Sequence, residues 1–216
     1  LSGVYMEPSE NGLNTAMERF WASWQEVAKN PTSEATRTSL LESAISLSSS
    51  FHSLSVQTTN LLEDLNNQVV LKVDEVNNIA SSIAQLNVEI ASARAVGYNP
   101  NDLMDKRDLL LDQLSRLADV RIHHLETGAI NVSLGGKVLV QNTKVFTLEA
   151  QNVSGKMVPV WQRDGSSMSA SQGELAGLAE VYDYIRDEVL GRLNELARTL
   201  ADEVHDLALT RGQTVR

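Results

Sequence analysis

The sequence lacks cysteine and has little proline and few aromatic residues. Its 216 residues include no Cys, 4 Pro and only 5% Phe, Trp and Tyr. Without thiols, the chain has no cysteine nucleophile, no cysteine-ligated zinc ion and no disulfide bond. No apolar run approaches the roughly 18 residues of a membrane-spanning helix, and no amino-terminal signal peptide is visible. We therefore expect no insertion into a membrane.

Basic residues are scarce relative to acidic ones. The chain has 18 Lys and Arg against 28 Asp and Glu, which gives a formal net charge of −10. The phosphate groups of nucleic acids and anionic lipids are bound mainly by Lys and Arg. The charge balance therefore argues against nucleic acid as a partner.

The sequence contains no common catalytic or cofactor-binding motif. Neither a GxSxG nucleophile elbow nor a GxxxxGK[ST] or GxGxxG phosphate loop is present. His52 and His205 have no second histidine at helical spacing. His123 and His124 are neighbours on a predicted strand, so they point to opposite faces. We therefore expect no cofactor, no metal ion and no enzymatic activity.

Helical periodicity dominates the first half of the chain. Apolar residues recur every three or four positions from Leu13 to Val27, which predicts an amphipathic helix that ends before Pro31. Residues 32–96 contain neither Gly nor Pro. They predict a second helix, capped by Thr32 or Ser33, that would be about 98 Å long if unbroken. The serine-rich residues 46–50 are the expected position of a kink.

A heptad repeat predicts that the second half of this helix packs against a partner helix. We expect Gly97 to end the helix, and Asn99 to cap a third helix with Pro100 at its first position and Asp102 at its third. The short connection predicts an antiparallel hairpin. The first heptad position holds Leu62, Val69, Val76, Ile83 and Ile90, and the position three residues later holds Leu65, Ile79, Leu86 and Ala93, with Lys72 as the exception.

The third predicted helix carries the residues that most resemble a catalytic or metal site. Asp102, Asp105, Asp108 and Asp112 fall on one face of it, and Arg107 lies toward its apolar side. A solvated stripe lacks the cleft that shifts the pKa values of catalytic carboxylates apart. It also lacks the turning, glycine-containing backbone of a calcium loop. We interpret the stripe as exposed helix surface, with Arg107 available to pair with a carboxylate or a helix end.

Two tryptophans are candidates for a contact with a neighbouring subunit. Trp21 and Trp24 lie three residues apart on the first predicted helix. We expect one of them in the core and the other as an exposed anchor. The candidate subunit-contact or structural-signature residues are therefore Trp21, Trp24, Asn101, Asp102, Asp105, Arg107 and Asp108.

Beyond residue 119 the periodicity changes from helical to alternating. Residues 120–172 predict a small antiparallel meander of four or five strands, with Pro159 on an edge. A long helix is expected after Gly173, with an eleven-residue repeat that keeps it nearly straight. Its apolar face holds Leu178, Tyr182, Ile185, Val189, Leu193, Leu196, Leu200, Val204 and Leu207.

The predicted fold class is mainly α (α+β), a bundle of long antiparallel, coiled-coil-like helices with a small β-meander insertion. We expect residues 1–119 to form a helical rod of three helices. Residues 120–172 would form the β subdomain, and residues 173–216 the returning helix that packs on the rod.

Several segments, in order along the chain, share the pattern of one family. They are EPSENGL (7–13), FWASWQEVAKNPTS (20–33), VDEVN (73–77) running to QLN (85–87), NDLMDKRD (101–108), INVSLGG (130–136) and GELAGL (173–178). With these segments the chain resembles the flagellar hook-associated protein 1 family, whose pattern includes NDL-x-DxRD. The terminal regions of that family are missing here, so we interpret the sequence as a core-domain fragment.

The resemblance implies a structural, axial subunit that joins the bacterial hook to the filament. It implies export of the unfolded full-length chain through the flagellar secretion channel, with an export chaperone, and assembly outside the cell. The implied partners are like subunits, hook protein and the filament-side junction protein. One alternative is a filament-side junction protein or flagellin-like axial protein, and another is a metal-dependent binder that uses Asp102, Asp105, Asp108 and His123.

Overall fold

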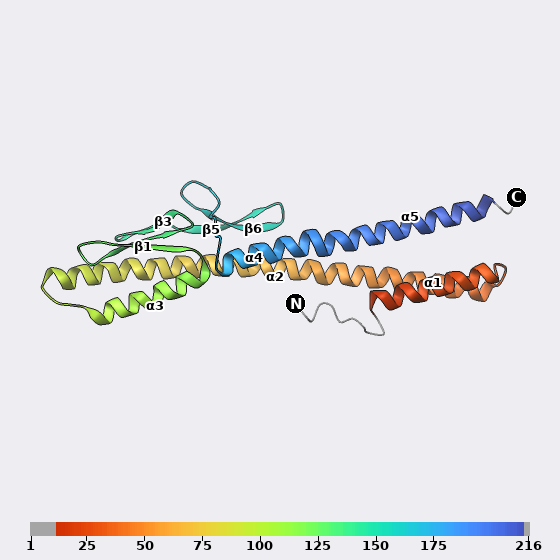
Figure 1. Ribbon diagram of the computed structural model, residues 1–216, viewed down its shortest axis with the longest axis horizontal. Coiled ribbons are helices and arrows are strands. Elements are labelled where there is room, and N and C mark those ends of the chain that lie inside the picture. Colours follow the sequence, from red (N-terminus) through yellow and green to blue (C-terminus); the bar gives the residue numbers. More distant parts are fainter. Residues whose placement is uncertain (1–11, 214–216) are drawn as a thin grey trace. The chain divides into compact units, whose positions relative to one another are not determined.

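The computed structural model describes residues 12–213, with side chains as far as Leu207 (Figure 1). Residues 7–11 of the first family segment therefore lie outside the described residues. The helices are α1 (Leu13–Lys29), α2 (Glu34–Ala95), α3 (Asn101–Leu117), α4 (Glu174–Asp183), the π-helix η1 (Tyr184–Leu190) and α5 (Gly191–Gln213). The strands are β1 (Val120–His124), β2 (Ile130–Leu134), β3 (Lys137–Gln141), β4 (Lys144–Val145), β5 (Leu148–Val153) and β6 (Lys156–Trp161). The predicted fold class, long helices with a small antiparallel β region, is confirmed.

The chain forms two compact units. The first unit contains the residues up to Leu62 and those from Ile185 onward, and the second unit is Glu63–Tyr184. The long helix α2 contributes residues to both units. The segment η1 begins at the last residue of the second unit and continues into the first.

In the first unit, α1 and α2 pack around a small aromatic core. Helix α1 ends at Lys29, as expected before Pro31, and the hydroxyl of Ser33 accepts a 3.4 Å hydrogen bond from the amide of Thr36 at the start of α2. Phe20 is buried against Leu47, and both Trp21 and Trp24 pack half-buried around it. The expectation of one core and one exposed tryptophan was therefore wrong, because both indoles border the same Phe20 ring.

Helix α2 runs unbroken through the serine-rich residues 46–50. The hydroxyl of Ser50 donates a 3.0 Å hydrogen bond to the carbonyl of Ser46. Farther along, Thr58 and Thr59 donate in the same way to carbonyls four residues earlier. These hydroxyls bond to the helix itself, so the polar run is accommodated without ending it.

In the second unit, α2 and α3 form the predicted hairpin. Gly97 has a φ of +83°, and the amides of Gly97 and Tyr98 bond to the carbonyls of Arg94 and Ala93, which is a Schellman motif. The expected cap at Asn99 was wrong, because Pro100 occupies the N-cap position and no side chain caps α3. Instead, the backbone amide of Asn101, which follows Pro100, donates a hydrogen bond to the carbonyl of Asn99.

The buried face of α2 is wider than the heptad predicts. All five residues of the first heptad position are buried, but Leu86 is only half-buried. The residues four positions after Val69, Val76 and Ile83 are also buried. They are Val73, Ala80 and Asn87. A broader face is needed because α2 packs against both α3 and the strands of the second unit.

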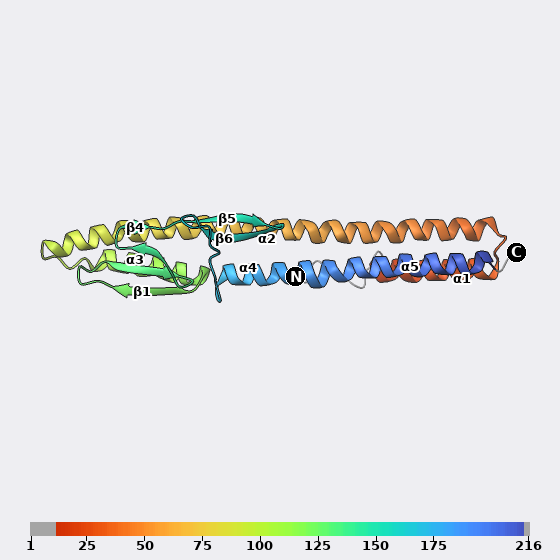
Figure 2. The same cartoon turned by 90° about the horizontal axis from the view of Figure 1, so that it is seen from above.

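The β region forms two sheets, whereas we expected one meander of four or five strands. Strands β1, β2, β3 and β4 form an antiparallel meander in that order, and β5 pairs with β6 in a separate two-stranded sheet (Figures 1 and 2). Ile130, Val132 and Leu134 of β2 are fully buried and face the helices. Pro159 lies opposite Ala150 in the two-stranded sheet, where every strand is an edge, as expected.

The returning helix differs from the sequence prediction in its middle. Residues Tyr184–Leu190 form a π-helix, whose hydrogen bonds span five residues instead of four. Leu193 is 7% exposed, but Leu196 and Leu207, both expected on the apolar face, are 40% and 36% exposed. Leu200 and Val204 of the predicted face are half-buried, together with Ala197, which was not predicted. The regular eleven-residue spacing assumed uniform α-helix and therefore misplaced the flanking leucines.

This difference predicts opposite outcomes for two neighbouring leucines. Leu193→Asp buries a carboxylate and should lower the free energy of unfolding by about 3 kcal/mol or more. Leu196→Asp leaves its carboxylate in water and should cost about 1 kcal/mol or less. Urea denaturation of the two variants measures both values, and equal losses would show that the face is misassigned.

Gly173, which precedes α4, is required by close backbone packing. Its φ is +87°, and a Cβ atom there would lie 2.7 Å from the backbone of Leu117 and Ala118. Because of the positive φ and this close contact, any other L-residue at position 173 would require the end of α3 to move. Gly177, one turn into α4, has no atom within 4 Å of an added Cβ.

We predict that Gly173→Ala lowers the free energy of unfolding by at least about 2 kcal/mol, because it combines backbone strain with a clash. Gly177→Ala is the matched control and should raise it by up to about 1 kcal/mol, because alanine loses less entropy in a helix. Chemical denaturation followed by circular dichroism tests the pair. A Gly173→Ala variant as stable as the wild type would contradict the packing described.

Candidate structural and subunit-contact sites

Arg107 of α3 lies in the interior of the second unit. Its side chain is 1% exposed, and its Nη1 donates hydrogen bonds of 3.2 Å to Asn87 Oδ1 and 2.8 Å to the carbonyl oxygen of Gly128. It forms no ion pair with any described residue, and its buried Nε has no partner among them. Burial lowers the pKa of the guanidinium, but an arginine stays charged in a protein. A buried cation is thus balanced by amide and carbonyl dipoles, and no neighbouring subunit can reach it.

Gly128, in the loop between β1 and β2, brings Arg107 and Arg94 together. Its φ is +87°, and a Cβ atom there would lie 2.6 Å from Cδ of Arg94. The loop is closed by hydrogen bonds from the Gly128 amide to the Leu125 carbonyl and from the Leu125 amide to the Ala129 carbonyl. The glycine therefore lets one arginine bond to the loop backbone while another lies across it.

Asn87 of α2 connects the same loop and strand to the helix. It is fully buried, and its Nδ2 donates to the carbonyls of Ile130 at 2.8 Å and Asn142 at 2.6 Å. Its Oδ1 accepts from the Ile130 amide at 3.0 Å and from Arg107. The side-chain amide thus satisfies both backbone groups of Ile130, as a neighbouring strand would.

Two further asparagines of α2 repeat this arrangement. Asn77 donates to the Leu148 carbonyl at 2.8 Å and accepts from the Leu148 amide at 2.9 Å. Asn66 donates to the Gly155 carbonyl and accepts from the Met157 amide, both at 2.7 Å. The three positions are separated by 11 and 10 residues, about three helical turns each, so they lie along one side of α2. We call Asn66, Asn77 and Asn87 the asparagine anchors, since they attach both sheets to one helix.

The anchors are not predictable from the sequence, although two of them lie in family segments. Their backbone partners are 43 to 91 residues away along the chain, so no local pattern indicates them. A signal exists only for Asn87, which occupies the heptad position filled by Val73 and Ala80 in the preceding turns. A polar residue in such a series requires a hydrogen-bond partner, because an unpaired buried amide is costly.

The turn between β5 and β6 is held from a second side by α4. The hydroxyl of Tyr182 donates a 2.9 Å hydrogen bond to the Gly155 carbonyl. Lys156 Nζ lies 2.7 Å from Asp183 Oδ2 and donates to the Ala179 carbonyl at 3.2 Å. The Gly155 carbonyl therefore accepts from Asn66 of α2 and from Tyr182 of α4, which fixes the turn between two helices.

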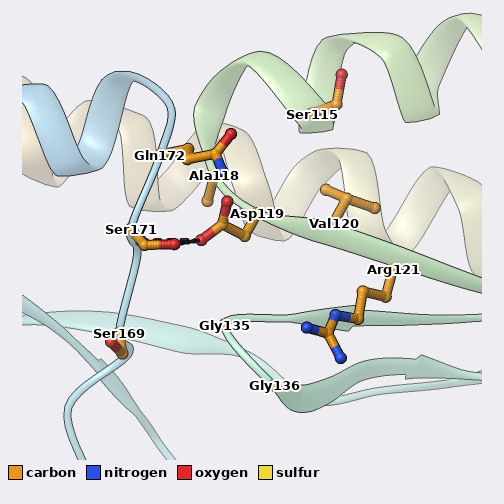
Figure 3. A pocket seen from close by; sticks show the side chains of 10 residues that line it. All are labelled: Ser115, Ala118, Asp119, Val120, Arg121, Gly135, Gly136, Ser169, Ser171 and Gln172. Atoms are coloured by element: carbon orange, nitrogen blue, oxygen red, sulfur yellow. Dashed lines mark hydrogen bonds between the residues drawn. The ribbon is translucent and has the colours of Figure 1, made fainter.

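An open polar groove lies where α3 runs into β1 (Figure 3). Its volume is about 670 Å³, and Asp119 and Arg121 are its charged lining residues. Asp119 accepts hydrogen bonds from the hydroxyl and the amide of Ser171, and these lower the pKa of its carboxyl below the usual range. Asp119 therefore holds Ser171 beside the start of β1, whereas Arg121 forms no ion pair with a described residue, although its charge acts on Asp119.

The acidic residues of α3 are exposed, as predicted. Asn101, Asp102, Asp105 and Asp108 all lie on the solvent side of the helix. Within residues 12–207, no group of three or more His, Asp and Glu side chains is placed to hold a metal ion. Among the described helices, none is long and apolar enough to cross a membrane.

Comparison with known proteins identifies the family. The sequence profile of the flagellar hook-associated protein FlgK helical domain matches residues 1–211. The chain belongs to the FlgK helical-domain family. The resemblance inferred from the short segments is thereby confirmed, and this family is one of structural proteins of the flagellum.

Relatives of the FlgK helical domain agree in sequence and in structure. Flagellar hook-associated protein 1 of Bacillus subtilis is 29% identical over 98% of this chain and 48% of its own length. The Escherichia coli protein of the same name is 26% identical over 91% of this chain and 38% of its own length. The flagellar hook junction protein FlgK of Burkholderia pseudomallei superposes with a TM-score of 0.72 at 28% identity, over 83% of this chain and 34% of that one. The chain thus spans about half, or less, of the length of these relatives.

The asparagine anchors predict a specific loss of stability in this FlgK helical domain. Asn87→Ala leaves the amide and carbonyl of Ile130, the Asn142 carbonyl and Arg107 without their partner, and should cost more than about 3 kcal/mol. Asn78→Ala is the matched control, because Asn78 is exposed on the same helix, and should cost less than about 0.5 kcal/mol. Urea titrations monitored by circular dichroism measure both, and similar values for the two variants would contradict the anchoring role.

Proposed function

We propose that this chain is the helical core of a subunit that joins the flagellar hook to the filament, and that it acts mechanically and not as an enzyme. The observation that carries the proposal is the family match over residues 1–211. The names of the relatives, flagellar hook-associated protein 1 and flagellar hook junction protein, support the same role.

The internal architecture suits a load-bearing part. The second unit attaches two small sheets to one long helix through side-chain-to-backbone hydrogen bonds, which are buried at Asn87 and partly buried at Asn77. Such bonds are directional, so the sheets cannot slide along α2 without breaking several of them together. A fixed relation between helix and sheet would let one subunit transmit torque or tension to its neighbours.

In this proposal the partners are like subunits, hook protein and the filament-side junction protein. The full-length chain would be exported unfolded by the flagellar secretion apparatus, with an export chaperone, and would assemble outside the cell. The exposed residues Asn101, Asp102, Asp105 and Asp108 are proposed to contact neighbouring subunits, together with the half-buried Trp21 and Trp24. Arg107 is proposed to serve within the subunit, because it is buried.

Complementation tests the proposed function. The full-length gene that contains this sequence is expressed in a strain that lacks its own hook–filament junction protein and sheds unassembled filament protein. We expect restored filaments on hooks, visible by electron microscopy, and restored swimming. Hooks that remain bare although the protein is exported would contradict the proposal.

Two variants control this experiment. Ile83→Asp places a charge in the fully buried face of α2 and should abolish complementation through loss of the fold. Asp64→Asn changes an exposed residue of the same helix and should complement like the wild type. The pair separates a requirement for the folded helical core from any effect of expression.

A further inference from the structure

The four-stranded sheet has an unusual charge composition for so acidic a chain. Its strands contain Arg121, Lys137 and Lys144, the neighbouring His123 and His124, and no Asp or Glu. The chain as a whole has a net charge of −10. The four-stranded sheet is therefore locally basic, and this charge is exposed on the face that is turned away from the helices.

The pairing register shows which side chains share this outer face. His123 lies opposite Asn131, Asn131 opposite Gln141, and Gln141 opposite Lys144, so these four form one row across all four strands. Arg121 and Ser133 form a parallel row beside it. The alternate residues Ile130, Val132 and Leu134 are buried against the helices, which places both rows on the outer side. Every polar side chain of these rows can donate a hydrogen bond to a carboxylate.

Two cations of this outer face form no ion pair with a described residue, namely Arg121 and Lys144. Lys137 of the same sheet is instead paired with Asp164, at 3.1 Å. Lys144 Nζ lies 5.0 Å from the centre of the Phe146 ring. Arg121 lines the open polar groove (Figure 3), where its charge also acts on the carboxylate of Asp119. Arg121 and Lys144 are thus exposed cations that a carboxylate of another chain can reach.

The opposite side of the same unit exposes the complementary charge. In Figure 1 the four-stranded sheet lies on one side of α3, whose buried face is turned toward the core. The outward face of α3 carries Asp102, Asp105, Asp108 and Asp112, none of which forms an ion pair with a described residue. The exposed Lys106 and Arg116 of the same helix offset part of the repulsion between these carboxylates, and a cationic partner would relieve the rest. The exposed Leu109 lies among them, at 60% exposure.

The two surfaces also match in length. Four strands place the ends of the row from His123 to Lys144 about 14 Å apart, at about 4.8 Å per strand. The stripe from Asp102 to Asp112 covers about 15 Å along α3, at about 1.5 Å per residue. One acidic stripe can therefore lie across one basic row.

We propose that the outer face of the four-stranded sheet, around Arg121 and Lys144, docks the acidic α3 face of a second copy of this chain. Because the two surfaces differ and lie on opposite sides of the unit, the contact is head-to-tail and propagates from subunit to subunit. The proposal rests on the proposed function, for which it names the faces through which like subunits meet. Two sheet faces meeting each other would bring cations together, so a symmetric pairing through this surface is disfavoured.

A charge-swap experiment on the purified chain tests the contact. The first variant, Asp105→Lys with Asp112→Lys, makes α3 basic, and the second, Arg121→Glu with Lys144→Glu, makes the sheet acidic. We expect each variant alone to self-associate at least about tenfold more weakly than the wild type, because both of its faces then have the same sign. An equimolar mixture should recover association to within about threefold of the wild type, because each face again meets its opposite.

Sedimentation velocity over a range of protein concentrations measures the self-association constants. The measurements are made at about 10 mM and about 150 mM salt, where the electrostatic screening lengths are about 30 and 8 Å. Circular dichroism confirms that each variant is folded. Glu63→Lys with Asp64→Lys is the matched control, since it changes two exposed carboxylates of α2, and it should associate like the wild type.

Two results would overturn the proposed contact. One is a wild-type chain that stays monomeric at both salt concentrations, and the other is a mixture that associates no better than the separate variants. Both are independent of complementation. If the chain restores filaments but shows either of these results, the proposed contact is wrong and the junction role stands. If the hooks stay bare but the charge-swap variants behave as expected, only the junction role is contradicted.

Discussion

The structure of the second unit depends on hydrogen bonds from asparagine side chains of one helix to the backbone of the sheets. Backbone amides and carbonyls at the edges of a sheet and at the ends of its strands must find partners when a helix covers them. A helix cannot supply them from its own backbone, because its internal groups are already bonded. Asn66, Asn77 and Asn87 supply them instead, since each primary amide offers a donor and an acceptor with the spacing of a peptide group.

The buried polar network around Asn87 follows from this use of asparagine side chains. Its Oδ1 accepts two hydrogen bonds, one from the Ile130 amide and one from the guanidinium of Arg107. Arg107 in turn bonds the Gly128 carbonyl, so the helix hairpin and the first strand connection share one network. A carboxylate in place of Asn87 would offer no donor to Ile130 or Asn142, which explains why a neutral amide faces the buried cation.

Much of the fold was predictable from periodicity, because periodicity reports which residues face a core. The heptad residues from Leu62 to Ile90 are buried as expected, and Gly97 ends α2 with a positive φ. The division of the strands into two sheets was not predictable, because the pattern of residues along a strand does not tell with which other strand it pairs. The π-helix at Tyr184–Leu190 also escaped prediction, because apolar residues three and four positions apart in the sequence are equally compatible with an uninterrupted α-helix.

For the candidate site residues, exposure was predictable from the sequence, but hydrogen-bond partners were not. Exposure of Asp102, Asp105 and Asp108 followed from helical geometry alone, and the structure agrees. The partners of Arg107 did not follow, because Asn87 and Gly128 are distant in sequence and neither is charged. An arginine predicts a carboxylate partner, whereas the fold provides an amide and a peptide carbonyl.

Native-state hydrogen exchange at the amides of Ile130, Leu148 and Met157 tests the anchoring most directly. Each of these amides donates to an asparagine Oδ1 of α2. If the sheets are held to the helix in this way, all three amides exchange only through opening of the whole second unit, as slowly as the slowest core amides of α2. Exchange of these three amides as fast as that of exposed loop amides, while the core of α2 stays protected, would show that the sheets are not anchored by the asparagines.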